Sequence, residues 1–293
     1  SNYGYNHNLI KGKIFGKKFS AKISDNLKII DFRLLKSGIK TEISLKDTKK
    51  ESELKGVFKS KILNTNIKFD FSYDEKNLKI YNSYFRNNDL SFNNESIIFF
   101  KPFFDVNLKF NINNINTKIF KKIDIDKIVE LKNIIRKINS KTEIIFKSKR
   151  LNQNFIDDFY LKIESAYGRI NYSKKFSISQ NFFECKGDIN FLEEYPLLFF
   201  DCLINLEEKQ ELFKELSIKT KNKKEKIKLK VKGKLNILAN KINFSEISTN
   251  ENYIASKEDL MYFKEIFQNL IFDETFIKIF NLKKFKKFIL EIS

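Results

Sequence analysis

The segment IKFDFSY, residues 67–73, decides the fold class of this chain of 293 residues. Its four apolar residues alternate with Lys68, Asp70 and Ser72. Because successive side chains of a β-strand point to opposite faces, this period of two predicts a strand with one apolar and one polar face. Turn-forming residues follow at 74–77, and the alternation then resumes. The pattern therefore predicts a β-hairpin.

Working outward, the same alternation extends over about residues 9–120 and returns in the second half of the chain. There it predicts strands at 142–146, 159–165, 169–172, 176–179, 182–191, 197–206 and 227–243. The lysine-rich stretch 219–226 is interpreted as a solvated loop.

Two regions change from a period of two to a helical period. Between 123 and 138 the apolar residues are spaced by three and four, which predicts one short amphipathic helix inserted in the sheet. A C-terminal helical end is predicted from Ser256 onward, because Ser256 and Asp259 fit the capping-box pattern. A further apolar and lysine-rich segment at 276–292 either packs on the sheet or contacts an anionic membrane. We therefore expect a mainly β antiparallel fold, with a β-rich region over 1–254 and a helical segment over 255–293.

The basic character of the chain is a weak guide to its partner. Its formal net charge is +19, which usually indicates a polyanionic partner. Lysine, Asn, Ile and Phe share A/T-rich codons, however, so nucleotide bias accounts for much of the lysine excess. Arginine, which grips phosphates and bases, is scarce; its positions are Arg33, Arg86, Arg136, Arg150 and Arg169. We expect no nucleic-acid partner.

Catalytic machinery is not evident in the sequence. Its single histidine, His7, lies in a polar N-terminal stretch, and the eight glycines form no phosphate-binding loop. Zinc sites built from Cys and His lack enough ligands, and the adjacent carboxylates at 157–158, 193–194 and 207–208 have no motif spacing. We predict a protein that is not an enzyme, with no catalytic residues, no metal site and no cofactor.

The two cysteines flank the turn-like segment 193–196. The numbers of Cys185 and Cys202 sum to 387, and they lie opposite one another if residues with that sum pair across a hairpin. Two outcomes are open. They form a disulfide in an oxidising periplasm, or they remain two buried free thiols.

A weak internal repeat consists of Lys-Gly pairs, with glycines at Gly12, Gly56, Gly187 and Gly233. Alternating apolar residues follow each pair, which suits repeated hairpin modules. Glycine at these places is expected to relieve a bend or bulge.

The chain resembles AsmA-like proteins of bacterial cell envelopes in three segments, 186–196, 255–292 and 85–104. The last of these segments leads directly into Asp105. The resemblance implies an elongated, curved antiparallel sheet, folded into a trough or groove with an apolar interior. It implies a periplasmic protein anchored to the inner membrane by an N-terminal segment missing from this chain, which begins with Ser1. It further implies a role in outer-membrane biogenesis and lipid transport, with phospholipid or a membrane surface, and other envelope proteins, as partners.

Strand parity nominates one set of residues to line such a groove. The candidates are Ile67, Phe69, Phe71, Leu78, Ile80, Val106, Leu108 and Phe110. Either they form an open lipid-binding groove or they close on one another as a sandwich core. The first alternative predicts lipid handling along the groove, and the second predicts a structural or assembly scaffold without a lipid ligand.

Overall fold

The computed structural model describes residues 7–14, 17–24, 28–35, 38–48, 52–62, 64–115, 136–148, 156–215, 226–239, 241–249 and 253–271. Contacts divide the chain into two compact units, Ser1–Asn116 and Thr117–Ser293. The regions 1–254 and 255–293 stay a prediction; the described C-terminal helix contacts the last strand of the second unit.

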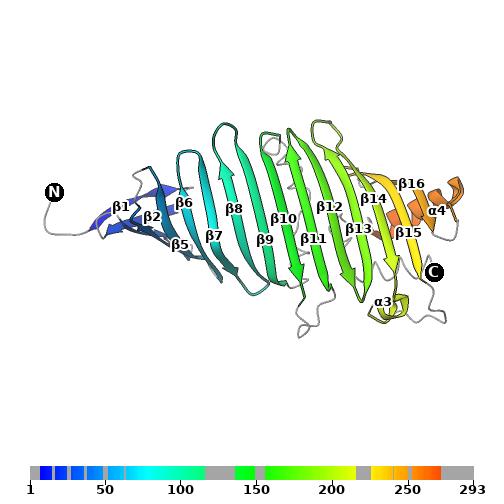
Figure 1. Cartoon of the computed structure of the whole chain (residues 1–293). Helices are drawn as coiled ribbons and strands as arrows, with labels where there is room; N and C mark the ends of the chain where they lie inside the picture. Colours follow the sequence, from blue (N-terminus) through cyan, green and yellow to red (C-terminus); the bar gives the residue numbers. More distant parts are fainter. Residues whose placement is uncertain are drawn as a thin grey trace. The chain divides into compact units, whose positions relative to one another are not determined.

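Antiparallel strands in chain order form the first unit (Figure 1). They are β1 (His7–Ile14), β2 (Lys17–Ser24), β3 (Ile29–Leu34), β4 (Ile39–Lys46), β5 (Leu54–Ile62), β6 (Thr65–Tyr73), β7 (Asn77–Arg86), β8 (Leu90–Phe99) and β9 (Asp105–Ile115). Each pairs with the next strand along the chain. The hairpin predicted at 74–77 is the β6–β7 turn, where the Asp74 carboxylate accepts backbone hydrogen bonds from Lys76 and Asn77, both 2.8 Å long.

The second unit repeats this order and adds helices. Its strands are β10 (Asn139–Lys147), β11 (Asp158–Ala166), β12 (Arg169–Ile178), β13 (Asn181–Asn190), β14 (Leu197–Leu206), β15 (Ile227–Asn236) and β16 (Lys241–Thr249), and its described helices are α3 (Lys209–Glu215) and α4 (Lys257–Ile271). All strand pairs between chain neighbours are again antiparallel. The prediction of a mainly β antiparallel fold with a helix near the C-terminus is confirmed.

Several predicted elements have different boundaries in the structure. The strands expected at 169–172 and 176–179 are one strand, β12, and the run 227–243 is divided between β15 and β16 by a turn. Helix α3 was not predicted. The inserted helix at 123–138 lies almost wholly outside the described residues, as do the segment 276–292 and most of the loop at 219–226.

The capping box predicted at the start of the C-terminal helix is confirmed. The backbone N–H of Asp259 donates to Ser256 Oγ at 3.1 Å, and the backbone N–H of Ser256 donates to Asp259 Oδ2 at 2.9 Å. These bonds satisfy two N–H groups that have no partner inside the helix. The helix packs on β16, where the rings of Phe267 and Phe244 meet edge to face at 5.9 Å.

The Lys-Gly repeat has a common structural basis. At each of its four glycines an aromatic ring from a neighbouring strand crowds the position that a Cβ would take, and at Gly56, Gly187 and Gly233 a backbone oxygen is closer still. The nearest rings are Phe19 at Gly12, Phe71 at Gly56, Tyr172 at Gly187 and Phe200 at Gly233. Of these four glycines, only Gly233 stands at a register shift, which lies between Lys232 and Gly233. Close aromatic approach, rather than a bulge, is therefore what the four glycines share.

Among the residues that the structure describes, the buried hydrophobic side chains lie in the second unit. Leu212 and Phe213 of α3 pack with Ile178 of β12 in one cluster. The others are Phe146, Phe191, Leu235, Ile237, Ile242 and Ile247.

Candidate functional site

The strand register gathers the eight candidate groove residues on one face of the first unit. Phe71 of β6 lies opposite Ile80 of β7. The row continues through Ser96 of β8 to Leu108 of β9. A parallel row joins Leu78 through Ile98 to Val106. Ile67 and Phe69 share the parity of Phe71 on β6, and Phe110 shares that of Leu108 on β9.

All eight side chains are half-buried. Within the described part of the first unit, the fully buried residues are Gly56, Ser60 and Ser96, and none of them is a large hydrophobic residue. Neighbours on the same face cover the sides of the apolar residues. A closed sandwich core would instead bury its large side chains fully.

The structure adds aromatic rings that were not among the candidates. Phe58 stacks on Phe69 at a centroid distance of 4.6 Å, and Phe85 stacks on Phe92 at 4.4 Å. Phe92 also meets Phe110 edge to face at 5.4 Å. The alternation of residues 54–62 places Phe58 on the apolar face of its strand. That it stacks on Phe69, however, depends on the strand register, which the alternation does not give.

Several polar groups between the candidate residues on this face are already paired. The hydroxyls of Thr41 and Ser60 lie 2.9 Å apart, and Ser60 Oγ also lies 3.2 Å from the carbonyl of Lys40, which it can reach as a donor. Ser83 Oγ donates to the carbonyl of Asn94 at 2.6 Å, and Ser96 Oγ donates to Asn94 Oδ1 at 2.5 Å. The face therefore offers a ligand apolar contact rather than open hydrogen-bonding groups.

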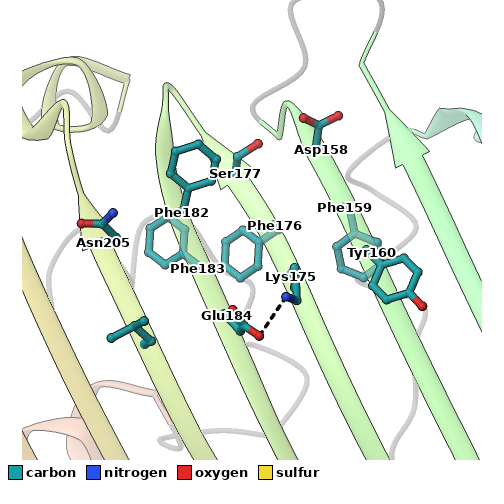
Figure 2. Close-up of a pocket in the computed structure, with 11 residues that line it drawn as sticks. Asp158, Phe159, Tyr160, Lys175, Phe176, Ser177, Phe182, Phe183, Glu184 and Asn205 are labelled. Carbon is teal, nitrogen blue, oxygen red and sulfur yellow. Dashed lines mark ion pairs between the residues drawn. The ribbon is translucent and has the colours of Figure 1, made fainter.

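The polar face of the second unit carries a shallow hollow across β11 to β14. Its volume is about 290 Å³. Figure 2 shows the ion pair of Lys175 and Glu184 among its lining residues, with an Nζ–Oε1 distance of 3.0 Å. Exposed Phe182 contributes an apolar wall, and the amide of Asn205 donates to Glu207 at 2.9 Å. Lys175 and Glu184 are exposed and already paired, whereas the side-chain carbonyl oxygen of Asn205 is buried without a hydrogen-bond partner among the described residues.

The histidine and the carboxylates considered for catalysis or metal binding do not come together in one site among the described residues. His7 begins β1, and within the described residues no group of three or more His, Cys, Asp or Glu side chains is arranged to hold a metal. Glu207 is paired with Lys226 at 2.7 Å, and the hydrogen bond from that lysine lowers the pKa of the carboxyl.

A cation stands on the apolar face of the second unit. Lys174 of β12 lies opposite Leu161 of β11 and Cys185 of β13, and its Nζ is 4.8 Å from the centroid of the Phe176 ring. Burial lowers the pKa of this lysine. On the same strand, burial and the nearby Asp188 carboxylate raise the pKa of Tyr172 to about 12.

Cys185 and Cys202 are direct partners of β13 and β14, in the register that sums to 387. Their sulfur atoms form a disulfide with a Cα–Cα distance of 4.1 Å. Of the two alternatives left by the sequence, the structure contains the disulfide.

Comparison with known proteins gives no family. No family model, no curated protein and no solved structure matches this chain. In the described part of the chain, no helix combines the length and apolarity needed to span a membrane.

Proposed function

We propose that this chain is a non-enzymatic cell-envelope protein of AsmA-like type, which binds or transfers phospholipid along its apolar sheet face. The observation that carries the proposal is the half-burial of all eight candidate residues on one face of the first unit. Contiguous apolar surface of this kind, when left partly open to solvent, is typical of a binding surface.

An acyl chain suits the chemistry of this face. Hydroxyl groups between the candidate residues are paired internally, as at Thr41 and Ser60. A ligand therefore gains chiefly from removing CH₂ groups from water, at about 0.8 kcal/mol each. An acyl chain laying about eight CH₂ groups on the face would gain roughly 6 kcal/mol.

The proposed location is the periplasm, with an inner-membrane anchor outside this chain. The disulfide of Cys185 and Cys202 supports an oxidising compartment, because such bonds persist in the periplasm and are rare in the cytosol. Phospholipid or a membrane surface is the proposed partner, together with other envelope proteins, in outer-membrane biogenesis.

Native mass spectrometry of the purified full chain tests the proposal through co-purifying phospholipid. Phe69→Asp and Leu108→Asp place a charge on the apolar face and should reduce the bound lipid at least tenfold. The fold should survive, because a partly solvated face tolerates a carboxylate that a sealed core does not. Asn107→Asp is the control, since it adds the same charge beside Leu108 but on the polar face.

The outcomes separate lipid binding from the scaffold alternative. Lipid loss in the two apolar-face variants, with an unchanged Asn107→Asp protein, supports a lipid-binding groove. Outright unfolding of Phe69→Asp or Leu108→Asp would place that residue in a closed core. A folded wild-type protein that carries no phospholipid would favour a structural or assembly scaffold.

A further inference from the structure

A continuous row of cross-strand partners, most of them cationic, crosses the polar face of the first unit. Direct cross-strand pairing links Lys11 to Ser20, Ser20 to Arg33, Arg33 to Lys40, Lys40 to Lys61, Lys61 to Asn66 and Asn66 to Arg86. Five of these seven positions, on β1 to β7, are cationic and none is acidic. We call this set the cationic row.

All five cations of the row are exposed. Among the described residues, none of the five takes part in an ion pair. The adjacent row toward the β6–β7 turn is different, because it contains Asp31 and Glu42, and Lys59 pairs with Glu42 at 2.8 Å. On this side the uncompensated charge therefore ends with the row, and on the other side exposed Lys13 and Lys18 extend it on β1 and β2 only.

Lysine-rich composition alone does not account for this placement. Arg33 and Arg86 are two of the five arginines in the chain, and both stand in the row. Like charges directly opposite on neighbouring strands also destabilise a sheet, yet Lys40 faces a cation on each side. In the second unit the polar face matches opposite charges instead, as at Lys175 and Glu184.

The dimensions of the row select the shape of its partner. Seven strands about 4.8 Å apart give a length of about 29 Å, whereas the next row, with its carboxylates, begins only about 7 Å away along the strands. A linear anion fits such a strip better than a planar anionic surface. The two polar positions between the cations are Ser20 and Asn66. The row itself therefore has no aromatic ring on which a nucleobase could stack, and the exposed Tyr84, whose hydroxyl accepts from Arg86 at 3.5 Å, stands in the next row.

We infer that the cationic row binds a linear, base-free phosphate polyanion. The phosphates would lie across β1 to β7, each near one lysine or arginine. Binding would release condensed counterions and would relieve the mutual repulsion of Arg33, Lys40 and Lys61. This site lies on the face opposite the proposed lipid surface and does not depend on it.

Inorganic polyphosphate is the probe, titrated against the full chain at several salt concentrations. Five contacts predict a slope of about −3.5 in log affinity against log salt, which is a loss of roughly 100-fold between about 50 and about 200 mM salt. Lys40→Glu should weaken binding roughly tenfold at low salt and reduce the slope. It should also raise the Tm, because the new carboxylate faces two cations. Arg33→Gln, which introduces no new charge, should weaken binding and reduce the slope by about 0.7.

Lys79→Glu is the matched control, because it makes the same charge change on an exposed polar-face residue of β7 outside the row. Its affinity for polyphosphate should stay within about threefold of wild type, since screening weakens distant charges. Equal losses of polyphosphate affinity in Lys40→Glu and Lys79→Glu would mean that only the net charge matters, and would refute a binding site at the cationic row. Absence of polyphosphate binding at low salt would also overturn it.

Two further probes test the identity of the anion. Tighter binding of single-stranded oligothymidylate of equal charge would overturn the base-free assignment. Binding of phosphatidylglycerol vesicles that Lys40→Glu abolishes, without polyphosphate binding, would assign the row to a membrane surface instead. Phospholipid carried by the apolar face should be unchanged in Lys40→Glu, so failure of this inference is distinct from failure of the lipid proposal.

Discussion

Replacing Gly56 by alanine should destabilise the first unit far more than replacing Gly12. A Cβ at Gly56 would stand 2.6 Å from the backbone oxygen of Ser44 and 2.7 Å from Cζ of Phe71. A Cβ at Gly12 would meet only the ring of Phe19, at 2.7 and 2.9 Å. The two substitutions are chemically identical, so the comparison isolates the effect of a backbone neighbour.

The magnitudes follow from what has to move. At Gly56 both a ring and a strand carbonyl must shift, and overpacking of this kind costs about 1–3 kcal/mol. Alanine recovers about 0.4–1 kcal/mol by restricting the unfolded chain. Because two groups must move, the cost at Gly56 should lie in the upper part of that range, about 2–3 kcal/mol, so the net loss of unfolding free energy is about 1–2.5 kcal/mol. At Gly12 a ring can rotate aside, so the net change should lie within about 0.5 kcal/mol.

Equilibrium urea unfolding measures the difference as a shift in midpoint at constant slope. Truncating the phenylalanine ring beside each glycine separates the cost of moving the ring from the cost of moving the backbone carbonyl. In a Phe71→Ala background, Gly56→Ala should still destabilise, because the Ser44 carbonyl remains. In a Phe19→Ala background, the cost of Gly12→Ala should vanish. Equal effects at both glycines, or full rescue of Gly56→Ala by Phe71→Ala, would refute the reasoning.

Two further predictions concern the second unit. Cys185→Ser should lower the unfolding free energy of the second unit by about 3 kcal/mol, because the disulfide no longer closes a loop in the unfolded chain. Wild-type protein titrated for thiols in denaturant should show no free thiol. Two free thiols in protein isolated from an oxidising compartment would contradict this prediction. Hydrogen bonds from the backbone and side chain of Ser256 and from the Tyr253 hydroxyl lower the pKa of Asp259. Its contribution to α4 is therefore full above the ordinary carboxyl value of 3.8 and is lost as the pH falls through the lowered pKa. Far-UV circular dichroism from neutral to acid pH should detect this loss of helix. The Asp259→Asn variant should lack the part of the acid transition that is due to Asp259. An identical acid profile in the variant and the wild type would contradict the role of Asp259 in capping α4.

Local sequence patterns were sufficient where each strand could be read by itself. The alternation of residues 67–73 predicted β6, and the turn residues after it predicted the hairpin with β7. The β13–β14 register, which was only assumed from the sequence, is the observed one, and the apolar residues alternate symmetrically about the turn that ends at Pro196. The capping box at Ser256 depends on two side chains only three residues apart.

The errors arise where tertiary context overrides the alternation. Lys174 interrupts the apolar pattern of β12, so one strand was predicted as two. In the structure its ammonium group lies over the Phe176 ring, and the strand continues. On β7 a register shift accompanies the positive φ of 48° at Asn82. That shift places Phe85 on the same face as Ile80 despite their odd spacing, so local parity would have misplaced it.

The cationic row illustrates a different limit of sequence reasoning. No single strand in it carries an unusual pattern, and its members become neighbours only through successive strand registers. The sequence justified attributing much of the lysine content to nucleotide bias. The arrangement of the five cations across the sheet could not be predicted without knowing how every strand from β1 to β7 pairs with the next.

Pairing between chain neighbours also bears on how such a sheet is made and how it can change. Every pairing described within either unit joins consecutive strands, so the contacts that build the sheet have low contact order, and hairpins can form as the chain emerges. Stability then approximates a sum over adjacent hairpins, as in solenoid proteins. A gene could lengthen or shorten either sheet by duplicating or deleting one hairpin without rethreading the chain. Loss of an odd number of residues within a strand would instead exchange its two faces.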